Sequence, residues 1–140
     1  MRAQAIADEI VHRLKRGAHD FIVFNLANAD MVGHTGNFQA TVEACEHVDQ
    51  ALGRIAKEVL AKKGHLIITG DHGNAELKVN VDTGEVMTEH TTNPVPFYLI
   101  SDRYRRKTVG AGMLADVAPT ILDIMNIPKP PEMTGFSLLR

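Results

Sequence analysis

Three short apolar runs most constrain how this 140-residue chain can fold. Each is rich in β-branched and aromatic side chains, as expected of a strand that is buried on both faces. In chain order they are DFIVFNL at residues 20–26, HLIITG at 65–70 and PVPFYLI at 94–100. The runs are too short for typical helices, and we therefore predict three buried β-strands.

Segments with helical periodicity flank and separate these strands. Apolar residues recur at helical spacing in three places, at residues 1–16, 37–63 and 116–125. Gly17 and Gly64 follow the first two helices as C-terminal stops. Two connections carry no such periodicity: a polar loop is predicted at residues 26–37, and an antiparallel hairpin with one exposed face at 76–88.

Alternation of strands with helices predicts the fold class. Strands joined by right-handed helical crossovers form a mainly parallel sheet with helices on its faces. We therefore predict an α/β fold, and the length suits a single domain. In such sheets, ligands bind outside the carboxyl ends of the strands.

Five potential metal ligands lie near these strand ends. Asp30 and His34 follow the first predicted strand, and Asp71 with His72 directly follow the second. His90 precedes the third strand, so only a loop that folds back would bring it to the same edge. Carboxylates and imidazoles without thiolates suit Mn²⁺, Zn²⁺ or Mg²⁺, and the histidines favour manganese or zinc. The set is sufficient for one ion and incomplete for two.

Each of these residues also has an ordinary alternative role. Asp30 could be a turn or cap residue, and Asp71 could belong to a turn after its strand. His34 and His90 could be polar loop residues. Their combination at strand ends nevertheless favours a metal site.

Composition excludes several classes of partner. The net charge of −2 and a pI near 6.4 provide no electrostatic surface for nucleic acid or an anionic membrane. No apolar run approaches the roughly 20 residues needed to cross a bilayer. The single cysteine, Cys45, falls on the apolar side of its predicted helix, where we expect it to be buried. A lone thiol favours a reducing compartment, and we predict a cytoplasmic protein.

No residue of the chain stands out as a catalytic nucleophile. Ser101 lies in a charged loop after the third strand, and Thr35 has the position of a helix-entry residue. The sequence also lacks a GxSxG elbow, a P-loop and a dinucleotide-binding motif. We therefore predict no catalytic residue within this chain.

Several motifs resemble one known family. They are NLANADMVGHTGN, EACEHVDQALG, ITGDHGNAE, EHTTNPVPF and the closing MTGFSLL, which together span nearly the whole chain. They closely resemble the C-terminal part of cofactor-independent (2,3-bisphosphoglycerate-independent) phosphoglycerate mutases, in the alkaline phosphatase superfamily. The resemblance implies a three-layer fold whose sheet is incomplete here, because its N-terminal strands lie outside the chain. Residues 1–140 would then be the C-terminal part of the metal-binding phosphatase domain, without the phosphotransferase domain.

The resemblance also implies a reaction. Members of the family are isomerases of glycolysis and gluconeogenesis that interconvert 3-phosphoglycerate and 2-phosphoglycerate through a phosphoserine, with two manganese ions. By this resemblance Asp30, His34 and His90 are the ligands of one ion, and Asp71 and His72 belong to the other. The family completes the second ion with an aspartate and the nucleophilic serine near the N-terminus, and neither has a counterpart here. We expect the isolated chain to be inactive.

Two other functions fit the same residues. The chain could be a non-catalytic metal-binding or assembly module that pairs with a separate N-terminal half. It could also belong to a phosphatase or phosphodiesterase of the same superfamily, although HTTNPVPF argues against this. The expected partners are therefore phosphoglycerate, in the complete enzyme, and the N-terminal part of the same protein.

Overall fold

The structure is a computed structural model that describes residues 2–140. Contacts divide the chain into two compact units, Met1–Asp102 and Arg103–Arg140. The first unit contains α1 (Ala3–Arg16), α2 (Asn28–Gly33), α3 (Phe38–Ala61), β1 (Leu66–Thr69) and β2 (Phe97–Ile100). The second contains the short 3₁₀ helix η1 (Leu114–Asp116) and α4 (Val117–Ile124).

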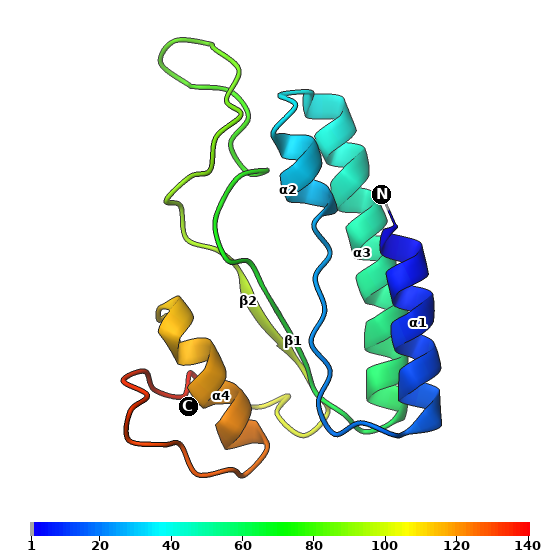
Figure 1. Ribbon diagram of the computed structural model, residues 1–140. Coiled ribbons are helices and arrows are strands. Elements are labelled where there is room, and N and C mark those ends of the chain that lie inside the picture. The colour runs from blue at the N-terminus through cyan, green and yellow to red at the C-terminus, as the bar shows by residue number, and fades with distance from the viewer. Residues whose placement is uncertain (1) are drawn as a thin grey trace. The chain divides into compact units, whose positions relative to one another are not determined.

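The two long helices of the first unit pack along each other (Figure 1). Both were predicted, and both are confirmed. α1 ends at Arg16 with Gly17 as its cap, while the turn after α3 is made by Lys63, which has a φ of 56°. At the start of α3, the Asn37 side chain accepts a hydrogen bond from the backbone N–H of Ala40.

The hydrophobic core of this unit lies between α1, α3 and β1. Small residues on α1 let the two helices approach closely, and Ile55 of α3 is completely buried. The buried cluster consists of Ala3, Ala7, Ile10, Ala51, Ile55, Val59 and Leu66. The apolar stripes predicted from the helical periodicity therefore form one contiguous core.

The second and third predicted strands are confirmed as β1 and β2, but their relative direction differs from the prediction. They pair antiparallel, with Leu66 opposite Ile100 and Thr69 opposite Phe97. A parallel pair needs a crossover connection, usually a helix, whereas residues 70–96 contain only turns and isolated bridges. The α/β class is confirmed, and the parallel sheet predicted from the alternation is not formed within the described residues.

The first predicted strand, residues 20–26, is extended but unpaired. Phe24 and Leu26 pack against the core, while Phe21 and Val23 are exposed by 53% and 76%. The side chains alternate as they would in a strand. No other described strand lies beside them to exchange backbone hydrogen bonds, so this segment does not enter the sheet.

Two local expectations are wrong and a third is confirmed. The polar loop predicted at residues 26–37 contains α2. The hairpin predicted at 76–88 is confirmed by an antiparallel bridge between Val79 and Val86, and its exposed face carries these two valines while Lys78 is buried. Cys45 was expected to be buried but is exposed, because the buried face of α3 carries Thr41, Ala44 and Ala51 instead. None of the described helices is long and apolar enough to span a bilayer.

The second unit is held together by hydrogen bonds between its helices and its C-terminal tail. The Asp116 carboxylate accepts from the backbone N–H groups of Met113 and Phe136, both at 2.8 Å. Thr120, which is completely buried, accepts from the backbone N–H of Leu138 at 2.9 Å. The predicted helix at 116–125 is thus confirmed as α4, preceded by one 3₁₀ turn.

The Asp116 hydrogen bonds predict an acid-sensitive second unit. The N–H groups of Met113 and then Phe136 lower the pKa of this carboxyl from its ordinary value. Because the pKa is lowered by folding, the stabilisation is present above the ordinary pKa and disappears as the pH falls through the folded value. In the Asp116→Asn variant, the amide has one acceptor oxygen for two N–H groups. We expect the variant to be less stable than the wild type at pH 7, and the difference to shrink at pH 3.

Amide NMR signals of residues 113–138, followed during thermal unfolding at both pH values, would measure this difference. Asp123→Asn is a poor control, since its carboxylate accepts from Ser137, whereas the exposed Glu132→Gln leaves the tail contacts intact. A difference that is equal at pH 7 and pH 3 would contradict the assigned role of the Asp116 charge.

Candidate metal centre

Three of the five predicted ligands meet in the first unit. Asp30 Oδ1 lies 3.3 Å from His34 Nε2 and 3.2 Å from His90 Nε2, and the two imidazole nitrogens are 3.1 Å apart. Asp30 is on α2, His34 directly follows that helix, and His90 comes from the loop before β2. The loop therefore folds back to the ligands that follow the first predicted strand. These three residues are called the trio below.

The spacing within the trio fits a small divalent cation. Around an ion with metal–ligand bonds of about 2.1 Å, neighbouring ligand atoms are about 3.4 Å apart in a tetrahedron and about 3.0 Å apart in an octahedron. The separations of 3.1–3.3 Å fall in this range. One carboxylate oxygen and two imidazole nitrogens are also a donor set that manganese and zinc accept. The trio thus fits a divalent metal in both spacing and chemistry.

The orientation of His34 is set by a backbone carbonyl. Its Nδ1 lies 2.7 Å from the oxygen of Thr88. Because a carbonyl oxygen can only accept, Nδ1 carries the proton in this contact. A neutral imidazole then presents the lone pair of Nε2 to Asp30 and His90, which is the arrangement typical of a metal-binding histidine.

The carboxylate of Asp30 is held in its charged form. Burial raises the pKa of this group, but the hydrogen bond from Asn74 and the nearby imidazoles of His34 and His90 lower it by more. The net pKa is therefore below the ordinary value for aspartate. The negatively charged Asp30 oxygen, which lies beside both imidazoles, is suited to bind a cation.

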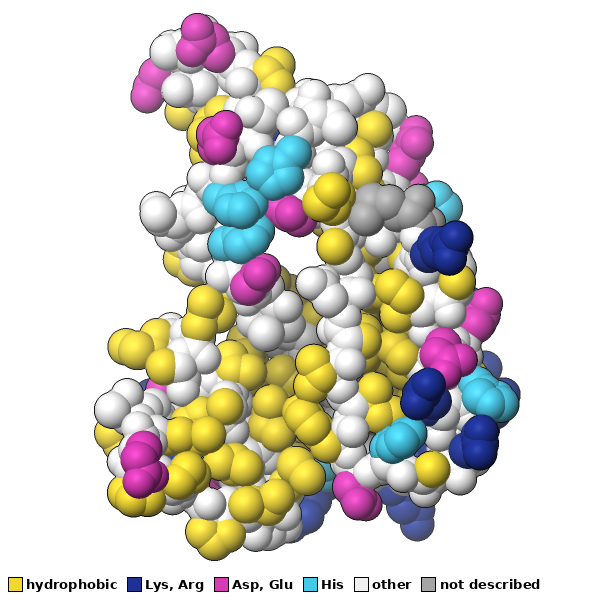
Figure 2. All heavy atoms as spheres, viewed as in Figure 1, with side chains coloured by type: hydrophobic (Ala, Val, Ile, Leu, Met, Phe, Trp, Pro, Cys, Tyr) yellow, Lys and Arg dark blue, Asp and Glu magenta, His cyan; other side chains and the backbone are white. Residues whose placement is uncertain are grey.

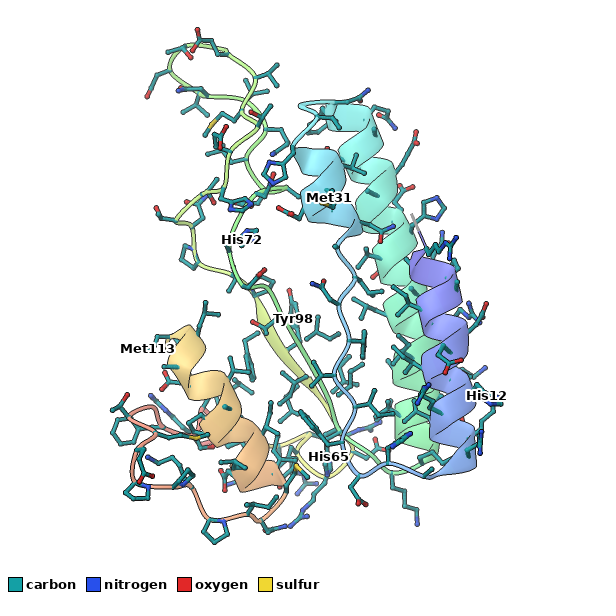
Figure 3. All side chains as sticks on the ribbon, viewed as in Figure 1. His12, Met31, His65, His72, Tyr98 and Met113 are labelled. Carbon is teal, nitrogen blue, oxygen red and sulfur yellow. The ribbon has the colours of Figure 1, made fainter. Side chains whose placement is uncertain are left out.

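Asp71 and His72 lie next to the trio without joining it. The His72 ring stacks on the ring of His90, with centroids 3.6 Å apart and an interplanar angle of 21°. Asp71 Oδ2 is 3.6 Å from His72 Nε2, and the side chain of Asp71 is 85% exposed. Figure 2 shows histidine side chains gathered beside acidic ones on one face of this unit, and Figure 3 places His72 on the segment that follows β1.

An exposed carboxylate, that of Glu76, joins the loop after β1 to the loop that carries His90. Glu76 accepts from the backbone N–H of Asn74 at 2.7 Å, from Asn93 Nδ2 at 3.0 Å and from the Thr91 hydroxyl. Burial raises the pKa of Glu76, but these hydrogen bonds, that of Thr91 first, lower it overall. Gly73 is required here, since a Cβ would collide with Thr91 and Glu76.

The two hydroxyl groups considered as nucleophiles are both engaged elsewhere. Ser101 is buried, with its Oγ 2.7 Å from His65 Nδ1. Thr35 donates to the carbonyl oxygen of Val32. Neither belongs to the trio.

Three residues around the trio were not singled out from the sequence: Asn74, Glu76 and Lys78. Asn74 and Glu76 could have been found, because they belong to the polar motif DHGNAE that carries Asp71. Lys78 gives no such signal. Alternation with its apolar neighbours predicts a solvent-facing position, yet its side chain is 4% exposed.

An α/β unit that brings a carboxylate and two imidazoles within 3.3 Å of one another fits the class of metal-binding domains. Comparison with known protein families agrees with this class, since residues 1–129 match the family described as the Metalloenzyme superfamily. The chain belongs to this superfamily.

Its relatives confirm the resemblance seen in the sequence. The chain is 49% identical over its whole length to a 2,3-bisphosphoglycerate-independent phosphoglycerate mutase of Clostridium botulinum, of which it covers 27%. It is 50% identical over 139 residues to phosphoglycerate mutase 2 of Methanosarcina barkeri, of which it covers 26%. The chain thus spans about a quarter of the length of these curated relatives.

A solved structure supports the same fold. A crystal structure of Leishmania mexicana phosphoglycerate mutase, determined at low cobalt concentration, matches the whole chain with a TM-score of 0.88 and 30% identity. The match covers 28% of the Leishmania chain. The alkaline phosphatase-like fold is therefore confirmed, and together with the superfamily the trio supports a site for a divalent metal ion.

Proposed function

We propose that this chain is the metal-binding portion of a 2,3-bisphosphoglycerate-independent phosphoglycerate mutase. In this proposal residues 1–140 form the C-terminal part of the phosphatase domain, and the complete protein interconverts 3-phosphoglycerate and 2-phosphoglycerate in the cytoplasm. The geometry of the trio carries the proposal, because separations of 3.1–3.3 Å between the three ligand atoms suit a divalent cation. Identity to mutases along the whole chain supports the assignment to this reaction.

The trio and the adjacent pair have different roles in the proposal. Asp30, His34 and His90 hold one ion, while Asp71 and His72 contribute to a second, with Mn²⁺ the proposed metal at both and Zn²⁺ an alternative. Bound metal of this kind polarises a phosphoryl oxygen and lowers the pKa of a coordinated nucleophile. The nucleophile itself comes from the N-terminal part of the mutase, since the two hydroxyl groups considered as nucleophiles, those of Thr35 and Ser101, are hydrogen-bonded to Val32 and His65.

One observation favours a second candidate function. Residues 20–26 are extended and have no strand partner among the described residues, which leaves backbone groups free to pair with another chain. A non-catalytic module that pairs with a separately encoded N-terminal half would use the same edge. The two candidates differ in whether the completed assembly turns over phosphoglycerate.

A chimera tests the enzymatic proposal. In it, this chain replaces the matching segment of the Clostridium botulinum mutase, to which it is 49% identical. We expect the purified chimera to convert 3-phosphoglycerate to 2-phosphoglycerate when Mn²⁺ is present, and chelation of the metal to remove the activity. The isolated 140-residue chain should be inactive under the same conditions, because it lacks the nucleophile.

The Asp71→Asn chimera should lose at least about 100-fold in kcat, since its carboxylate serves the second ion. The exposed Asp49, on α3, provides a matched control, and Asp49→Asn should leave the rate unchanged. A folded, Mn²⁺-binding chimera without any mutase activity would favour the non-catalytic module. Activity of the isolated chain that survives repurification and depends on Asp71 would contradict the proposed division of the enzyme.

A further inference from the structure

Two buried polar side chains form a chain of hydrogen bonds that ends at the trio. Asn74 and Lys78 are each only 4% exposed. Lys78 Nζ donates to the side-chain oxygen of Asn74 and, at 3.2 Å, to the carbonyl oxygen of Gly33. Asn74 Nδ2 in turn donates to Asp30 Oδ1 at 2.8 Å. The order of contacts is therefore Lys78 to Asn74 to Asp30.

The lysine determines which end of the amide faces the trio. A side-chain amide has an accepting oxygen and a donating nitrogen, whereas an ammonium group can only donate. Contact with Lys78 therefore selects the oxygen of Asn74 and leaves its NH₂ group directed at Asp30. With the amide reversed, an oxygen would face the Asp30 carboxylate, and the two acceptors would repel each other.

Asn74 also reaches the imidazole of His34. Its Nδ2 lies 3.3 Å from His34 Nε2, whose lone pair is free to accept because Nδ1 faces the Thr88 carbonyl. The NH₂ group thus contacts an oxygen and a nitrogen of the trio at once. These atoms would otherwise be acceptors without a donor in a half-buried site.

The backbone around Lys78 is adapted to this contact. Gly33 ends α2, and a Cβ at this position would collide with Asn74 Oδ1 and approach Lys78 Nζ. No carboxylate of the described residues forms an ion pair with Lys78. A buried lysine is costly unless its donors are used, and here they are used on Gly33 and Asn74.

We infer that Lys78 and Asn74 are positioning residues for the metal site, with Lys78 orienting the Asn74 amide so that the amide holds Asp30 and His34 in ligand geometry before the ion binds. This inference rests on the proposed function, because it assumes that the trio binds a metal. It makes Mn²⁺ affinity depend on a lysine that touches none of the trio side chains.

Calorimetric titration with Mn²⁺, on the chain and on the chimera described above, tests the inference. Asn74→Ala and Lys78→Met should each weaken Mn²⁺ binding about 10- to 100-fold, the usual effect of removing a partner that orients a ligand. Lys78→Gln, which keeps a donor for the Asn74 oxygen, should bind more tightly than Lys78→Met. Lys57→Met, an exposed lysine on α3, is the matched control and should leave the affinity unchanged.

The double variant separates positioning from a general structural role. If Lys78 acts through Asn74, adding Lys78→Met to Asn74→Ala should change Mn²⁺ affinity by less than about 2-fold, because the two residues act through one contact. The inference would be overturned if the losses of Mn²⁺ affinity in the two single variants added in the double variant. It would also be overturned if the single variants kept wild-type affinity and lost only thermal stability. If Lys78→Met fails to fold, the Lys78→Gln variant takes its place. Should Lys78→Gln bind Mn²⁺ no more tightly than Asn74→Ala does, the inference is also overturned.

The same titrations keep this inference apart from the proposed function. An active chimera whose Mn²⁺ affinity is unaffected by these substitutions would contradict the positioning role and leave the mutase assignment standing. A chimera that binds Mn²⁺ with the expected dependence on Lys78, yet has no activity, would contradict the mutase assignment alone.

Discussion

Exchanging Asp30 for asparagine is expected to weaken Mn²⁺ binding to the chain by about 100-fold or more. Loss of a residue that only orients a metal ligand usually lowers metal affinity 10- to 100-fold. Asp30 supplies the only negative charge of the trio, and its Oδ1 lies within 3.3 Å of both imidazole nitrogens. The amide keeps the size of the side chain but removes the charge that attracts the cation. Calorimetry, or the Mn²⁺ signal in electron paramagnetic resonance, measures the affinity directly.

Two comparisons define the result for Asp30. His34→Ala should show a loss of similar size, because it removes a second ligand of the same ion. The exposed Asp49→Asn changes the net charge equally and should leave binding within about 2-fold of the wild type. An Asp30→Asn variant that binds Mn²⁺ as tightly as the Asp49→Asn control would rule out the trio as the metal site.

Truncating Ile55 to alanine is expected to lower the free energy of unfolding of the first unit by about 3 kcal/mol. Ile55 is 0% exposed and lies at the centre of the cluster that joins α1, α3 and β1. Removal of its side chain both forfeits burial and leaves a cavity that the small neighbours Ala7 and Ala51 cannot fill. Because a domain is stable by only about 5–15 kcal/mol in total, the loss would be a large fraction.

Urea unfolding followed by circular dichroism at 222 nm would measure the change at Ile55. Ile55→Val, which removes one methylene group, should cost about 1 kcal/mol. Lys57→Ala, on the exposed side of the same helix, should remain within about 0.5 kcal/mol of the wild type. If Ile55→Ala destabilised the protein no more than Ile55→Val, the position would be less tightly packed than the structure shows.

The helices and strands that depend on local pattern could be predicted from the sequence. α1 and α3 each have an apolar stripe long enough to identify, and β1 and β2 are compact runs of branched and aromatic side chains. The pairing of the strands could not be predicted in the same way, because direction depends on the connection between them. Residues 20–26 show the same limit, since their pattern specifies an extended chain but not a neighbour.

The sequence predicted which residues form the candidate site, but it did not predict their geometry. Asp30, His34 and His90 were selected by type and by position near strand ends, and the structure brings their ligand atoms together. Their role as metal ligands remains a prediction. Lys78 could not be found, because its polar, alternating position indicates exposure. Its burial arises from contacts with Gly33 and Asn74, which are 45 and 4 residues away in the sequence.

The distance along the chain between members of the trio links metal affinity to folding. His34 and His90 are separated by 56 residues, and closing a flexible loop of that length costs on the order of 4 kcal/mol in chain entropy. The hydrogen bond between His34 Nδ1 and the carbonyl oxygen of Thr88 holds the two ends of this loop together, while the pairing of β1 with β2 and the Glu76–Asn93 contact fix the segment that carries His90. A bound ion would therefore act as a reversible cross-link on a loop that is already closed. Substitutions far from the trio that loosen this loop would lower the apparent affinity of the trio for the ion.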